Sequence, residues 1–139
     1  MMDTISLDNC FGCGKDNPIG LHLNNTYVEN KSHIEFEVNA NHCGYPGLMH
    51  GGLTGMLFDE AMFYAIKKSG IITVTVSMTI DYISPGLEGH MLICEAEIDN
   101  IDGRRIDVAG EIKDTENGKL IAMASGRFLE VDLKRLLNS

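Results

Sequence analysis

One apolar helical stretch, followed by a long alternating segment, constrains the fold of this chain most strongly. Residues 53–68 place apolar side chains around much of a helix, contain no proline and end near Gly70, a residue suited to a helix C-terminus. Residues 73–82 then alternate between apolar and polar side chains until Pro85 ends the run. Because such a helix must be buried on most sides, we expect a sheet to cover it.

Further alternating segments predict the rest of that sheet. The candidate strands cover residues 21–27, 33–38, 73–82, 92–98, 106–112 and 120–131. The expected turns are Glu29–Ser32, Asp102-Gly103 and Asn117-Gly118. The last strand is apolar on both faces, which predicts a central position or an interface. Together the helix and these strands predict an α+β fold in which one long helix packs on five or six antiparallel strands.

Length and charge narrow the functional classes. At 139 residues the chain predicts one domain, residues 1–139, with a Gly- and Cys-rich N-terminal segment at residues 1–20. The net charge of -9 argues against a nucleic-acid surface, which needs clustered basic residues. No apolar run reaches the length of about 20 residues that a membrane span needs. The first eight residues lack the pattern of a secretory signal, so we expect a cytoplasmic protein.

The start of the apolar helix carries the strongest chemical pattern. A glycine pair, Gly51-Gly52, follows His50 and lets the free amides of a helix N-terminus approach a carbonyl or a developing oxyanion closely. Asp59 lies further along the same helix and could act as a base or a nucleophile. Successive helical residues diverge by about 100 degrees, so we expect Asp59 at an interface and Glu60 on the surface.

The spacing of these groups predicts two subunits. Eight residues separate Gly51 from Asp59 by about 12 Å along a helix axis. A reacting carbonyl lies about 3 Å from both its amide donor and its attacking group, so one helix cannot supply both. Two antiparallel helices related by a two-fold axis can, which predicts an obligate homodimer.

The four cysteines predict little chemistry. Without a secretion signal we interpret them as reduced thiols. Cys10 and Cys13 have the spacing of half a zinc site, which Cys43 with His42 or His22 could complete. Because no second pair with such spacing exists, a structural or incidental role is favoured over metal binding or redox chemistry. We therefore expect no metal site.

Two pairs of basic residues could meet a small anionic ligand. They are Lys67-Lys68 and Arg104-Arg105. The simpler interpretation for each pair is solvated surface charge.

Several motifs together resemble the hotdog-fold thioesterases, in particular the PaaI-like group that hydrolyses acyl-coenzyme A. They are Cys10–Gly14, Asn17–Leu21, Gly44–Gly52, Asp59–Ala61 and the strand Thr75–Tyr82 that closes at Pro85. The resemblance covers most of the chain. It implies a sheet wrapped around the long helix, two subunits joined edge to edge, and a thioester held at their interface.

The resemblance also implies roles for individual residues. Asp59 matches the catalytic carboxylate, acting as general base or nucleophile, and Gly51 matches the amide donor to the carbonyl. His50 matches a histidine that shapes the helix start, and Thr75 a hydroxyl that helps to hold the attacking water. Several relatives carry Asn or Gln near the position of Gly44, so the oxyanion hole is either simpler here or includes His42.

Structural interpretations remain for each of these residues. The glycine pair could only permit tight helix entry, and His50 could only cap the helix. Thr75 is a common strand former, and simple alternation places it opposite the apolar face.

The resemblance leaves the substrate and the assembly open. Substrate contacts are expected from Gly52, Met56, Phe63, Arg104 and Arg105, with Met62 and Tyr64 as further candidates for an acyl tunnel. Coenzyme A belongs to the substrate, and no cofactor is expected. The alternatives are a non-catalytic acyl-coenzyme A binding or sensing protein, or a hotdog dehydratase or hydratase. The dimers could pair into tetramers.

Overall fold

The computed structural model describes residues 5–139. Its elements, in chain order, are β1 (Asn25–Val28), β2 (Lys31–Glu37), the 3-10 turn η2 (Ala40–His42), α1 (Gly51–Lys67), β3 (Thr73–Tyr82), β4 (Met91–Asp102), β5 (Arg105–Asp114), β6 (Leu120–Glu130) and α2 (Leu133–Leu137).

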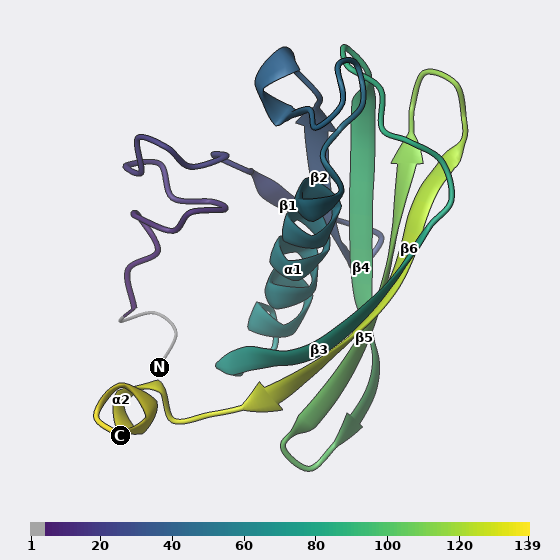
Figure 1. The fold of residues 1–139 in the computed structure, drawn as a ribbon. Coiled ribbons are helices and arrows are strands. Elements are labelled where there is room, and N and C mark those ends of the chain that lie inside the picture. The colour runs from purple at the N-terminus through teal and green to yellow at the C-terminus, as the bar shows by residue number, and fades with distance from the viewer. Residues whose placement is uncertain (1–4) are drawn as a thin grey trace.

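One antiparallel sheet of six strands curves around the long helix α1 (Figure 1). The strand order is β1-β2-β4-β5-β6-β3, so β1 and β3 form the two edges. The predicted α+β class and the arrangement of helix and sheet are confirmed. The last long strand, β6, lies between β5 and β3, as its two apolar faces predict.

The core lies between α1 and the concave face of the sheet. Leu57, Phe58, Met62 and Ile66 of α1 have no exposed surface. A Cβ at Gly126 of β6 would lie 2.5 Å from the Met62 sulfur, so the helix packs closely only because that residue is glycine. Met62 therefore fills the core, and its interpretation as a tunnel residue is wrong.

Several boundaries differ from the predicted ones. The start of α1 at Gly51 matches the predicted start at the glycine pair, and His50 caps the helix. Strand β1 begins only at Asn25, and the turn to β2 narrows to Glu29 and Asn30, both with positive φ. The short helix α2 is an element that the alternation did not predict.

Strand β3 contains a bulge that changes which side chains face the helix. Thr75 pairs with Phe128 of β6, while Ser77 pairs with Arg127, so Val76 is the extra residue and is 51% exposed. A bulge shifts the alternation by one residue, because directly paired residues share a face. Thr75 therefore lies on the same face of the sheet as the buried Phe128, toward α1.

No helix among residues 5–139 is both long enough and apolar enough to cross a lipid bilayer.

Candidate functional site

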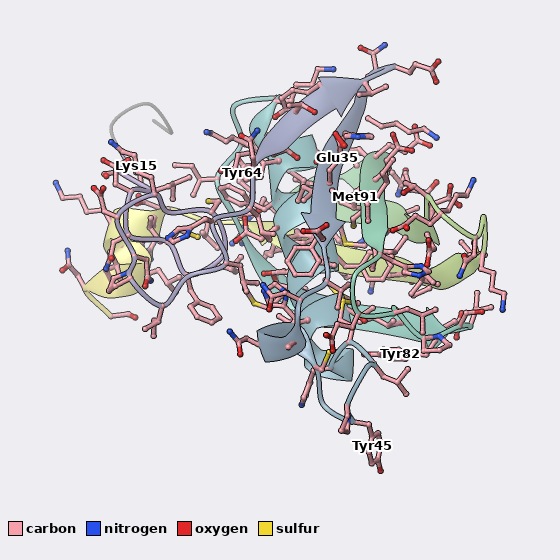
Figure 2. The ribbon with its side chains drawn as sticks, turned by 90° about the horizontal axis from the view of Figure 1, so that it is seen from above. Lys15, Glu35, Tyr45, Tyr64, Tyr82 and Met91 are labelled. Atoms are coloured by element: carbon pink, nitrogen blue, oxygen red, sulfur yellow. The ribbon has the colours of Figure 1, made fainter. Side chains whose placement is uncertain are left out.

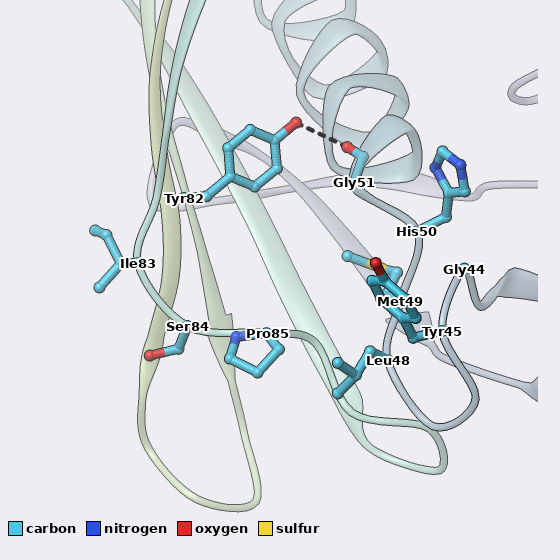
Figure 3. Close-up of a pocket in the computed structure, with 10 residues that line it drawn as sticks. All are labelled: Gly44, Tyr45, Leu48, Met49, His50, Gly51, Tyr82, Ile83, Ser84 and Pro85. Carbon is cyan, nitrogen blue, oxygen red and sulfur yellow. Dashed lines mark hydrogen bonds between the residues drawn. The ribbon is translucent and has the colours of Figure 1, made fainter.

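A pocket of about 610 Å³ opens at the N-terminus of α1 (Figure 3). It is lined by Gly44, Tyr45, Leu48, Met49, His50, Gly51, Tyr82, Ile83, Ser84 and Pro85. The loop before the helix and the end of β3 thus form its two walls. His50 and Gly51 are the two predicted site residues that lie here.

The helix start leaves one backbone amide free. The His50 Nδ1 atom accepts the Gly52 N–H at 2.8 Å, which caps the helix and fixes the proton of the neutral ring on Nε2. The Gly52 amide is therefore occupied. The Gly51 N–H has no acceptor among residues 5–139 and lies at the positive end of the helix dipole.

The loop upstream holds His50 through its backbone. The His50 N–H donates to the His42 carbonyl at 2.9 Å. The His42 ring packs against Phe36 at a tilt of 43°, and its Nδ1 accepts the Asn39 N–H at 3.0 Å. Burial lowers the pKa of His42. Because this ring is not among the residues that line the pocket, His42 supports the helix start through its carbonyl.

Tyr82 is a site residue that the sequence interpretation missed. Its hydroxyl donates to the Gly51 carbonyl at 2.8 Å, so the ring closes the pocket beside the free amide (Figure 3). The signal in the sequence was its place at the end of β3, two residues beyond Ile80 on the face of the strand that packs toward the core.

Asp59 and Thr75 meet further along the helix. The Thr75 hydroxyl donates to Asp59 Oδ1 at 2.6 Å. The simple alternation that placed Thr75 opposite the apolar face is wrong, because the bulge turns Thr75 toward α1. The other carboxylate oxygen, Oδ2, has no partner among residues 5–139.

Asp59 belongs to a helix face that the sheet does not cover. We call Gly52, Met56, Asp59 and Phe63 the open helix face, because their spacing places them on one side of α1 and none of them is buried. The opposite side, which includes Leu57 and Ala61, packs into the core. Met56 and Phe63 are thus available to a ligand or to a second subunit.

One chain does not bring the two halves of the predicted site together. The helix is continuous from Gly51 to Lys67, so Gly51 and Asp59 remain about 12 Å apart along its axis. Asp59 and Thr75 are not among the residues that line the pocket.

Arg104 and Arg105 also lie away from the pocket. Arg104 lies in the turn between β4 and β5 and Arg105 begins β5, at the end of the sheet remote from the start of α1 (Figure 1). The Arg104 guanidinium donates to the Glu130 carbonyl at 3.1 and 3.2 Å, and Arg105 pairs with Asp102 and Asp107. The geometry of a single chain does not bring either arginine to the pocket, so their contact with substrate stays a prediction.

The predicted surface position of Glu60 is wrong. Glu60 is only 9% exposed because residues of the N-terminal segment cover it. Cys10 Sγ donates to Glu60 Oε1 at 3.4 Å. The structure thus gathers Cys10 and Cys13 with Glu60, and not with the His22, His42 or Cys43 side chains that the sequence offered.

Comparison with known proteins identifies the family. The model of the thioesterase superfamily matches residues 46–121, more than half of the chain. Mouse acyl-coenzyme A thioesterase 13 is 33% identical over 91 residues, which cover 63% of this chain and 64% of that protein. Across the first three curated relatives, the match spans between 38% and 67% of the relative's own length.

Solved structures share the architecture. A point mutant of the phenylacetic acid degradation protein PaaI from Thermus thermophilus superposes with a TM-score of 0.70 at 26% identity, covering 80% of this chain and 95% of that one. A hypothetical thioesterase protein with coenzyme A from Streptococcus pneumoniae gives a TM-score of 0.73 at 18% identity, covering 78% and 85%. The resemblance to PaaI-like proteins is confirmed, and the chain belongs to the thioesterase superfamily and has its hotdog fold.

Proposed function

We propose that the protein hydrolyses an acyl-coenzyme A thioester at a site shared between two subunits. The Gly51 amide of one subunit polarises the thioester carbonyl, and Asp59 of the partner subunit activates water or attacks the carbonyl itself. Water is the only other reactant, so the reaction needs no cofactor. Relatives named as acyl-coenzyme A thioesterases and a structural neighbour with coenzyme A support the substrate class.

The contact between Thr75 and Asp59 carries this proposal. A hydroxyl that donates to Oδ1 at 2.6 Å orients the carboxylate and leaves Oδ2 for a water molecule. The contact lies on the open helix face, where a substrate can reach it.

The open edge of β3 supports the two-subunit arrangement. Its ten residues pair with β6 on one side only within residues 5–139. Val76, Tyr82 and Ile83 expose 51%, 60% and 52% of their surface along this edge and its continuation. Pairing of this edge with its symmetry mate would place two α1 helices next to each other in opposite directions. Association of dimers into a tetramer stays a prediction, as does the cytoplasmic location.

The test is thiol release from short, medium, long and aryl acyl-coenzyme A thioesters. We expect the parent to release thiol and Asp59→Asn to fall by about 10²–10⁴-fold, because the amide removes the base but keeps the shape. Asp99→Asn, the same change at an exposed residue of β4, is the matched control and should retain activity.

Three outcomes would contradict the proposal. Unchanged turnover in Asp59→Asn would remove this residue from the mechanism. A parent protein that releases no thiol but still binds acyl-coenzyme A would indicate a binding or sensing protein. An altered acyl chain on an intact thioester would indicate a hydratase or dehydratase.

A further inference from the structure

Residues 5–20 of the N-terminal segment fold against α1, and three metal-ligating groups gather there, away from the pocket. Cys10, Cys13 and Glu60 each offer one ligand atom, and these atoms all lie within 4.8 Å of one another. In a tetrahedral zinc site with Zn–S bonds of about 2.3 Å, two sulfur ligands are about 3.8 Å apart. The three side chains thus need only a small contraction to hold one ion.

Glu60 lacks a partner that a cation would supply. The side chain is nine-tenths buried, and its Oε2 atom has no hydrogen-bond partner. No basic side chain of residues 5–139 forms an ion pair with it. A buried carboxylate is costly unless it is paired or coordinates a metal. The Cys10 thiol satisfies only Oε1, so the cluster is incomplete as a hydrogen-bond network.

The backbone of the cysteine loop is shaped around this carboxylate. A Cβ at Gly12 would lie 1.9 Å from Glu60 Oε1, so only glycine lets Glu60 reach between the two cysteines. The Gly14 N–H donates to the Cys10 carbonyl at 2.8 Å, which curls the loop and turns both thiols to one side. The Leu23 N–H donates to the Gly12 carbonyl at 2.8 Å and ties the loop to the chain that leads into β1.

One contact beside the cluster suits a thiolate ligand. The Tyr64 hydroxyl donates to Cys13 Sγ at 3.0 Å, a contact that stabilises a negative sulfur. Two thiolates, one carboxylate and a divalent cation carry a net charge of about -1. Lys15 and Lys67 line a neighbouring pocket of about 550 Å³ together with Cys13 and Tyr64, on the side of the N-terminal segment (Figure 2). Asp8 lines the same pocket, so the two lysines leave it with a net positive charge, which offsets the net negative charge of the site.

We propose that Cys10, Cys13 and Glu60 bind one Zn²⁺ ion, with a water molecule from the neighbouring pocket as the fourth ligand. Two sulfurs with one carboxylate oxygen match the borderline-soft character of this ion. The ion fastens the N-terminal segment to α1, one residue from Asp59. The sequence interpretation missed this site because it sought the remaining ligands among histidines and cysteines, while Glu60 lies 50 positions from Cys10.

Cobalt substitution tests the site without reference to thioester hydrolysis. The full chain is reduced, stripped with a chelator and titrated with Co²⁺, whose thiolate complexes absorb by charge transfer. We expect one Co²⁺ per chain, displaced by Zn²⁺. Cys13→Ser and Glu60→Gln should weaken binding by at least about tenfold, whereas Cys43→Ser, a half-buried cysteine outside the cluster, should bind as the parent does.

Three results would overturn the site, and the first two come from the metal titration. One is a reduced parent chain that shows no thiolate-to-cobalt band at stoichiometric metal. The other is unchanged affinity in Glu60→Gln, which would remove Glu60 as a ligand. Recovery of a metal-free protein with a Cys10–Cys13 disulfide from anaerobic purification would indicate a redox pair and also contradict the proposal. The parent titration depends on no variant, so a folding defect in a variant does not decide the result.

Discussion

At the scale of single residues, the hydrogen bond between Thr75 and Asp59 determines what the carboxylate can do. A free aspartate side chain samples several staggered rotamers, and the hydroxyl favours the one that brings Oδ1 within 2.6 Å. An attacking group held in one orientation gains rate through positioning, without a change in its own chemistry.

The first prediction concerns this hydroxyl. Thr75→Val keeps the branched shape and removes the donor. We expect kcat to fall by roughly 10- to 100-fold, the equivalent of about 1.5–3 kcal/mol for a hydrogen bond to a charged group. Steady-state thiol release, with kcat and KM measured separately, reports the effect.

Thr75→Ser is the matched control, because serine keeps the hydroxyl and loses only a methyl group. Its kcat should stay within a few-fold of the parent. Equal kcat values for the parent and Thr75→Val would show that the hydroxyl does not position Asp59.

Asp59 and Glu60 show how far the sequence alone predicts the direction of a side chain. The 100-degree divergence correctly indicated that Asp59 and Glu60 point to different sides of α1. It could not show that Cys10 covers Glu60, since that contact joins residues 50 positions apart. Which polar residue becomes buried depends on such tertiary contacts, and local periodicity does not contain them.

At the scale of secondary structure, the start of α1 depends on one side chain. His50 accepts the Gly52 N–H, which would otherwise lack an intrahelical partner. Glycine in the first turn is a poor helix former, so Gly51 and Gly52 make this cap more important. The orientation of the free Gly51 amide follows from the same cap.

The second prediction concerns this cap. His50→Ala should lower the free energy of unfolding by about 1 kcal/mol, because the Gly52 N–H loses its acceptor. His50→Asn is the matched control, since an asparagine oxygen can accept the same N–H and should retain most of the stability. Urea denaturation measures both, and equal losses in the two variants would argue against capping.

The strands show the limit of alternation as a predictor. Period-two patterns located β2 to β5 because each pattern is local and one face of each strand is buried, and a run that is apolar on both faces located β6. The bulge at Val76 has no distinct signature within the regular run of residues 73–82, yet it moves Thr75 from one face to the other. Bulges depend on pairing with a second strand, so the orientation of Thr75 required the structure.

At the scale of the whole molecule, Asp114 connects the ends of three strands. It ends β5, is 1% exposed, and accepts N–H groups from Glu116 and Asn117 in the turn to β6. His90, just before β4, donates to its Oδ2 atom at 2.7 Å. Burial alone would raise the pKa of Asp114, but these hydrogen bonds hold it below the usual value of 3.8.

The third prediction concerns the pH dependence of stability. A folded-state pKa below the unfolded value contributes stability that is present above pH 3.8 and lost as the pH falls from there through the lower folded-state pKa. Asp114→Asn should therefore cost about 1–3 kcal/mol at neutral pH and show a shallower loss on acidification than the parent. Asp99→Asn should keep the parental slope in urea denaturation between neutral and acidic pH, and parallel slopes for the parent and Asp114→Asn would contradict the assignment.

The length of helix between Gly51 and Asp59 has a genetic consequence. In the proposed dimer each subunit gives its amide to one site and its carboxylate to the other, because about 12 Å of helix separates the two groups. A mixed dimer of one normal chain and one chain without Asp59 then keeps one complete site. Loss of Asp59 in one gene copy would behave as recessive, and an allele that blocks the Gly51 amide would complement an allele that lacks Asp59.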